Sequence, residues 1–162
     1  MSIAIYSGTF DPFTLGHEDV LSRACRIFDH VIVAVADDCN KKTFFTFEER
    51  IALAQQIVSQ YPNASAEGFS GLLCDFVKRK NSSVIIRGVR NGSDFDYETR
   101  MASINHNLNR DVQTVFFPPM DNTQFISGTL VREIRRLGGD VSPFVSPLVL
   151  KALNAKYETN QK

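Results

Sequence analysis

The 162-residue sequence lacks a long apolar run, a cysteine cluster and a net charge. No apolar stretch approaches the roughly 20 residues needed to span a bilayer, and no basic segment leads into an apolar one at the start, so we expect neither a membrane protein nor a secretory leader. The three cysteines show no CxxC spacing, which argues against a disulfide framework or thiolate zinc site and suits a reducing compartment. Because 18 basic residues balance 18 acidic ones, a nucleic-acid-binding surface is not expected.

Short apolar runs alternate with longer segments of helical periodicity. Strands are predicted at residues 3–6, 31–36, 83–88 and 114–117, with a weaker candidate at 64–69. Helices are predicted at residues 16–27, 46–60, 72–80, 94–108, 129–137 and from 146 onward. This alternation predicts a single doubly wound, Rossmann-like α/β domain over residues 1–162, with a five-stranded parallel sheet and a frayed tail at about 157–162.

Two of the predicted helices carry clear internal signals. Thr46 and Glu49 have the spacing of a capping box at the start of segment 46–60. Segment 94–108 places four apolar residues at helical spacing, which predicts one apolar face; they are Tyr97, Met101, Ile104 and Leu108.

Ligands of doubly wound sheets bind beyond the carboxyl ends of the strands, so the loops at those ends are candidate sites. The first of them reads SGTFDPFTLGH and ends at His17. Gly16 and His17 fall at a helix start, where free N–H groups attract anions. The loop matches neither a Walker A sequence nor GxGxxG. From spacing alone, His17 is equally well a working group or a core histidine bonded to a backbone carbonyl.

The pattern G-T-F-D-P-x-T-x-G-H in this loop resembles the TxGH signature of the nucleotidyltransferase superfamily. Three further stretches resemble motifs of the phosphopantetheine adenylyltransferase family, in the same order: KKTFFTFEERIALAQQ at 41–56, IIRGVRNGSDFDYE at 85–98 and FISGTLVREI at 125–134. The resemblance covers the chain from Ile5 to about Leu153. It implies an enzyme that transfers the adenylyl group of ATP to 4′-phosphopantetheine, giving dephospho-coenzyme A and pyrophosphate in coenzyme A biosynthesis.

The resemblance also implies roles for single residues. His17 would be catalytic, stabilising the transition state through a hydrogen bond to the α-phosphoryl group. The acceptor substrate would be bound by Thr9, Lys41, Leu73 and Arg87. ATP would be bound by Thr9, Phe10, His17, Gly88, Val89, Arg90, Glu98, Thr123, Gln124, Phe125, Ile126, Ser127, Gly128 and Thr129.

The family further implies a homohexamer. From the composition we expect a cytoplasmic protein with no nucleic-acid or membrane partner, and from the chemistry of the triphosphate we expect Mg²⁺ as the cofactor. No residue is assigned to the metal, because Mg²⁺ is commonly held by substrate phosphates and water. The sequence departs from the family pattern at Gly128 and Thr129, which replace two serines, and at Thr123, where an aromatic residue is common.

Simpler interpretations stand beside these roles. Lys41 and a neighbouring lysine could be solvated, Arg87 could form a surface ion pair with Asp94 or Asp96, and Leu73 could serve core packing. Two other functions are also open. One is a small nucleotidyltransferase with a different acceptor, such as nicotinate mononucleotide or glycerol phosphate; the other is a nucleotide-binding module without catalysis.

Overall fold

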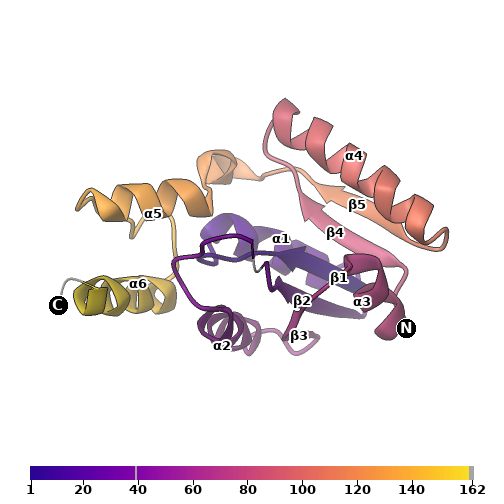
Figure 1. The fold of residues 1–162 in the computed structure, drawn as a ribbon, viewed down its shortest axis with the longest axis horizontal. Coiled ribbons are helices and arrows are strands. Elements are labelled where there is room, and N and C mark those ends of the chain that lie inside the picture. Colours follow the sequence, from indigo (N-terminus) through magenta and orange to yellow (C-terminus); the bar gives the residue numbers. More distant parts are fainter. Residues whose placement is uncertain (39, 161–162) are drawn as a thin grey trace.

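The computed structural model describes residues 1–38 and 40–160, which contain a five-stranded parallel sheet in the order β3-β2-β1-β4-β5 (Figure 1). The strands are β1 (Ile3–Gly8), β2 (His30–Ala36), β3 (Ala64–Phe69), β4 (Val84–Gly88) and β5 (Gln113–Phe117). In register, Ile5 lies beside Ile32 of β2 and Ile85 of β4. The predicted fold class is confirmed, and the weakest predicted strand is present as β3.

The helices follow the predicted segments to within a few residues. They are α1 (Leu15–Cys25), α2 (Phe47–Val58), α3 (Leu73–Arg79), α4 (Gly92–Leu108), α5 (Gly128–Arg136) and α6 (Pro147–Asn160), with a 3₁₀ helix η1 (Asp121–Phe125). The capping box of α2 is formed, since the Thr46 side chain accepts from the Glu49 N–H and the Glu49 side chain accepts from the Thr46 N–H. Within the described residues, no helix is long and apolar enough to cross a membrane.

Helices cover both faces of the sheet because successive strand side chains point to opposite sides. Val31 and Val33 of β2 pack into the larger core, which includes buried side chains of α1, α2 and α6. Ile5 and Ile85 point the other way, into a smaller core with Phe76 of α3. The double covering explains the continuous apolar runs of the central strands.

Helix α4 carries the predicted apolar face, but much of that face is open to solvent. Tyr97, Ile104 and Leu108 are 55%, 50% and 57% exposed. Glu98 and Asn105 are the buried side chains of this helix. The spacing therefore identified residues that share a face without indicating whether that face meets the sheet.

The C-terminal helix α6 lies beside α5 beyond the carboxyl ends of the strands (Figure 1). It continues to Asn160, through most of the segment at 157–162 that was expected to fray. The Tyr157 ring stacks on Phe44 with centroids 4.7 Å apart, which fixes this part of the helix by tertiary packing. Residues 161–162 lie outside the described residues.

Candidate active site

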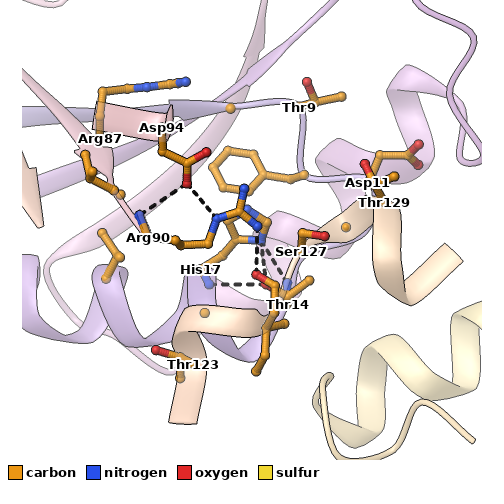
Figure 2. A pocket seen from close by; sticks show the side chains of 18 of the residues that line it. Thr9, Asp11, Thr14, His17, Arg87, Arg90, Asp94, Thr123, Ser127 and Thr129 are labelled. Carbon is orange, nitrogen blue, oxygen red and sulfur yellow. Dashed lines mark hydrogen bonds and ion pairs between the residues drawn. The ribbon is translucent and has the colours of Figure 1, made fainter. Parts of the chain in front are cut away.

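A cavity of about 280 Å³ opens at the carboxyl ends of β1 and β4. The strand order changes direction at this pair of strands, and such a switch point is where doubly wound sheets bind their ligands. Figure 2 shows side chains from separate parts of the chain converging there. The lining includes most residues of the predicted site: Thr9, Phe10, His17, Lys41, Arg87, Gly88, Val89, Arg90, Glu98, Thr123, Ile126, Ser127, Gly128 and Thr129.

His17 is oriented by Thr14, the first residue of the TxGH motif (Figure 2). Thr14 is the N-cap of α1 and is almost fully buried. Its backbone N–H donates to the His17 Nδ1 atom at 2.9 Å, and its hydroxyl oxygen lies 3.0 Å from the same atom. Among the described residues, the ring is held through an accepted N–H bond from Thr14, and no backbone carbonyl accepts from it, which differs from the arrangement expected of a core histidine.

The hydrogen bond from Thr14 also fixes the tautomer of His17. A backbone N–H can only donate, so Nδ1 must be unprotonated and the neutral ring carries its proton on Nε2. Burial, together with the positive charges of Arg90 and Arg87, lowers the pKa of His17 to about 3. The side chain at neutral pH is therefore an uncharged Nε2–H donor on the cavity wall.

The loop after β1 is built around Phe10, whose backbone φ of +49° lies in the left-handed region. Such a conformation is uncommon for a bulky residue and marks a segment whose surroundings impose its shape. The ring stacks on Phe13 at 4.6 Å and meets His17 edge-on at 5.0 Å. A Cβ at Gly8 would lie 3.1 Å from this ring, so glycine allows the strand and the aromatic ring to approach.

Arg87, at the end of β4, forms a forked ion pair with Glu98 of α4. Its Nε and Nη2 atoms donate to the two carboxylate oxygens at 2.8 and 2.6 Å, and Nη1 donates to the Ser7 carbonyl at 2.7 Å. Burial alone would lower the pKa of Arg87, but the hydrogen bonds and charge of Glu98 outweigh it and raise the pKa. The ion pair is with Glu98 and not with Asp94 or Asp96.

Two further arginines on the cavity wall also have carboxylate partners. Arg90 donates to Asp94 at 2.9 Å and to the Ile126 carbonyl at 3.1 Å, which joins the β4 loop to the segment before α5 (Figure 2). The Arg132 Nη1 atom of α5 lies 3.6 Å from the buried carboxylate of Asp11. Each arginine is thereby oriented before any substrate arrives.

Lys41 and Lys42 complete the cationic lining of the cavity. Neither pairs with a carboxylate among the side chains that the structure describes. The lining holds five Lys and Arg side chains against three Asp and Glu side chains, so the wall carries an excess of two positive charges. A cavity with this excess is suited to phosphate groups.

The N-terminus of α5 forms another part of the wall. The Ser127 side chain accepts from the Leu130 N–H, so it serves as an ordinary N-cap while also lining the cavity. A Cβ at Gly128 would lie 3.1 Å from the Asp11 carbonyl oxygen. The glycine that departs from the family pattern thus permits close contact between this helix and the β1 loop, and the free N–H groups of the helix start remain a phosphate-binding feature.

Three predicted site residues lie outside this cavity. Gln124 and Phe125 do not line it, and Phe125 is 74% exposed, because the 3₁₀ helix η1 turns it outward. Leu73 lines a second cavity of about 90 Å³, whose wall also contains Arg87 and Glu98. The forked ion pair therefore separates the two cavities.

Sequence reasoning missed Asp11, Thr14, Arg132 and Arg50. Arg50 is 2% exposed, and its Nη1 atom donates at 2.8 Å to the carbonyls of Thr9 and Ala36, at the ends of β1 and β2. The signal that could have identified it is its place on the apolar side of α2, where a charged residue needs polar partners.

Together, the fold and the cavity define a nucleotidyltransferase of the TxGH type, with a histidine and a helix N-terminus at a cationic cavity. The model of the cytidylyltransferase-like family matches residues 5–134. Phosphopantetheine adenylyltransferases from Ralstonia nicotianae and Bordetella pertussis are 56% and 55% identical, over 96% of this chain and 93% and 92% of theirs. The enzyme of that name from Cupriavidus metallidurans is 55% identical over 96% of this chain and 97% of its own. The chain belongs to the phosphopantetheine adenylyltransferase family.

Two solved structures share the fold at low sequence identity. One is a protein of Vibrio parahaemolyticus provisionally named a nicotinate-nucleotide adenylyltransferase, with a TM-score of 0.66, 18% identity, and coverage of 94% of this chain and 99% of that one. The other is a lipopolysaccharide core biosynthesis protein of Thermoplasma volcanium, with a TM-score of 0.55, 22% identity, and coverage of 75% and 99%. At these identities the likeness concerns the fold alone.

Proposed function

We propose that the chain transfers the adenylyl group of ATP to 4′-phosphopantetheine, giving dephospho-coenzyme A and pyrophosphate. Family membership supports the reaction. The structural observation that carries it is the convergence, at one cavity, of a neutral His17 Nε2–H donor, the lysines Lys41 and Lys42, and the N-terminus of α5. These are the groups that a phosphoryl-centred displacement requires.

The acceptor substrate would bind across the two cavities. Its phosphate would lie near Thr9 and Lys41, with Arg87 at the boundary, and its pantetheine arm would enter the second cavity beside Leu73. In support, Lys41 has no carboxylate partner among the described side chains, and the Arg87–Glu98 pair lies on the walls of both cavities. The smaller cavity has an apolar side formed by Leu73 and Met101.

ATP would occupy the larger cavity. Its triphosphate would bind at Ser127–Thr129, where the start of α5 presents N–H groups, and at Arg90, which already joins the two loops. The backbone at Gly88–Val89 and the side chains of Thr123 and Ile126 would border the nucleotide. Other predicted ATP contacts are to Thr9, Phe10, His17 and Glu98, and to Gln124 and Phe125 only if the η1 segment moves on binding.

In the reaction, an oxygen of the acceptor phosphate attacks the α-phosphorus of ATP in line, and the bond to the pyrophosphate oxygen breaks. The attacking phosphate is already an anion, so no general base is needed. His17 would donate its Nε2–H to an α-phosphoryl oxygen as charge increases there. Positioning by the loops around the cavity supplies much of the remaining rate enhancement.

We further propose that Mg²⁺ arrives with the nucleotide and offsets charge on the β- and γ-phosphates. Among the described residues, no group of three or more His, Cys, Asp or Glu side chains is placed to hold a metal ion. A cation carried by substrate phosphates and water fits this donor set, because Mg²⁺ usually keeps several waters and few protein ligands.

We propose a homohexamer in the cytoplasm as the working form. The exposed apolar side chains Tyr97, Ile104 and Leu108 of α4 form a face of the kind that marks protein–protein contacts. The unpaired Cys25 and Cys74 suit a reducing compartment.

The decisive experiment is a pyrophosphate-release assay with ATP, Mg²⁺ and a panel of acceptors. We expect turnover with 4′-phosphopantetheine and none with nicotinate mononucleotide, glycerol phosphate or pantetheine, which lacks the phosphate. Turnover only with another phosphate acceptor would reassign the substrate. Tight ATP binding with no pyrophosphate release for any acceptor would indicate a binding module.

A further inference from the structure

The C-terminal helix reaches the active-site wall through Tyr157. Its ring stacks on Phe44, with centroids 4.7 Å apart and an interplanar angle of 27°. Its hydroxyl donates to the backbone carbonyl of Arg132 at 3.1 Å. Phe44 belongs to the segment at 41–45 that begins with Lys41, whereas Arg132 lies in α5, so Tyr157 contacts two parts of the chain that contribute to the cavity wall.

The same two neighbours are also joined through Asp11. The Phe44 N–H donates to Asp11 Oδ2 at 2.8 Å, and the Phe45 N–H donates to Oδ1 at 2.9 Å. Arg132 pairs with this carboxylate and also donates to the Asp11 carbonyl. Asp11, Phe44, Arg132 and Tyr157 therefore form a closed ring of contacts, which we call the clasp.

Tyr157 is itself held from several directions. The Arg135 guanidinium lies 4.9 Å from the centre of its ring, and Arg135 also donates to Asn154 of α6. The adjacent Lys156 donates to both carboxylate oxygens of Glu49, at 2.9 and 2.7 Å, which ties α6 to α2. A helix anchored in this way can fix the position of Phe44.

We propose that Tyr157 is a positioning residue, which acts through the clasp to hold the segment at 41–45, and with it Lys41, in place against α5. This inference rests on the proposed function, in which Lys41 holds the acceptor phosphate and the start of α5 holds the triphosphate. Because Lys41 is the group that holds the acceptor phosphate, a displaced segment at 41–45 weakens acceptor binding and raises the KM for the acceptor. Tyr157 lies outside the motifs that resemble the family, since the last of them ends at residue 134.

The test compares three variants in the pyrophosphate-release assay. Tyr157→Ala removes the stacking and the hydroxyl, and we expect the KM for 4′-phosphopantetheine to rise about tenfold, with the KM for ATP changed by less than about twofold. Tyr157→Phe keeps the ring and should restore the acceptor KM to within about threefold of the wild type. Leu148→Ala is the matched control, since Leu148 packs on the core from the same helix without a place in the clasp; it should lower Tm and leave both KM values unchanged.

A second measurement does not depend on activity. The Phe44 and Phe45 N–H groups donate to the Asp11 carboxylate. Hydrogen exchange at these two amides should be faster in Tyr157→Ala than in the wild type or in Leu148→Ala. Unchanged amide exchange in Tyr157→Ala would overturn the proposal. Faster exchange in that variant without a rise in its KM for 4′-phosphopantetheine would do the same, and so would an equal rise of this KM in Leu148→Ala. A wild type that does not turn over 4′-phosphopantetheine would refute the proposed function instead, and the role proposed for Lys41 with it, while the exchange rates would still decide whether Tyr157 holds the segment.

Discussion

Replacing His17 by alanine tests the centre of the proposed mechanism. The variant loses the Nε2–H donor that the Thr14 N–H sets up by bonding to Nδ1 at 2.9 Å. Removing one preorganised transition-state donor typically lowers kcat by about 10²- to 10³-fold, equivalent to about 2.7–4 kcal/mol. We expect a fall of that size in kcat, with both KM values changed far less, because the interaction forms as charge develops on the α-phosphoryl group.

The pH dependence sharpens this prediction. Because burial and the charges of Arg90 and Arg87 lower the pKa of His17 to about 3, the neutral ring is the donor throughout the physiological range. The acceptor phosphate, whose second ionisation lies near pH 6, affects the wild type and the variant alike. The ratio of the two kcat values should therefore stay constant from about pH 6.5 to about pH 8.5.

The assay is pyrophosphate release at saturating substrates, with His106→Ala as the control for loss of an imidazole outside the cavity lining. Near-wild-type turnover in His17→Ala would refute the catalytic role. A ratio of wild-type kcat to variant kcat that falls as the pH rises, approaching tenfold per pH unit, would show that the imidazolium is the working form and that the tautomer argument is wrong.

The lowered pKa of His17 also affects stability. Below about pH 6.5 the unfolded chain binds a proton at this histidine and the folded chain does not, so the free energy of unfolding should fall as the pH drops below that value, by up to about 1.4 kcal/mol per pH unit.

Three other variants test separate parts of the site. Lys41→Ala should raise the KM for 4′-phosphopantetheine by about tenfold or more and leave the KM for ATP unchanged, which steady-state kinetics will show; equal rises in both would remove the assignment to the acceptor. Glu98→Gln leaves Arg87 without its charged partner and should lower the urea-derived free energy of unfolding by about 1–3 kcal/mol. This is less than for a fully buried pair, because the Arg87 side chain is 29% exposed. An unchanged urea midpoint would mean that the pair adds little to stability. Ile104→Lys places a charge on the exposed face of α4 and should shift the sedimentation profile toward smaller species, and an unaltered profile would exclude this face as the subunit contact.

The fold could be predicted from the sequence because its signals are local. Buried parallel strands require continuous apolar runs, and Val31–Ala36 shows one; the Thr46–Glu49 capping box marks a helix start without reference to the rest of the chain. Even the weak strand β3 was placed correctly, since its position between two helical segments left few alternatives. The same reasoning brought the motif loops to one edge of the sheet.

The detailed chemistry of the site depends on contacts between distant residues, which spacing cannot supply. Arg87 pairs with Glu98, although Asp94 and Asp96 are closer in sequence, because the direction in which α4 packs decides which carboxylate faces β4. Asp11 accepts from the N–H groups of Phe44 and Phe45, more than thirty residues further on. Neither pairing leaves a trace in local periodicity, so both required the structure.

Helix α4 shows where periodicity and burial separate. Tyr97, Ile104 and Leu108 share a face at helical spacing, yet they are about half exposed, while the charged Glu98 lies on the buried side. Periodicity reports that residues lie on one side of a helix; it does not report what covers that side. In a chain that packs alone, an apolar face that large would ordinarily turn toward the sheet, so its outward direction supports the proposed subunit contact more strongly than the apolar composition of the helix alone.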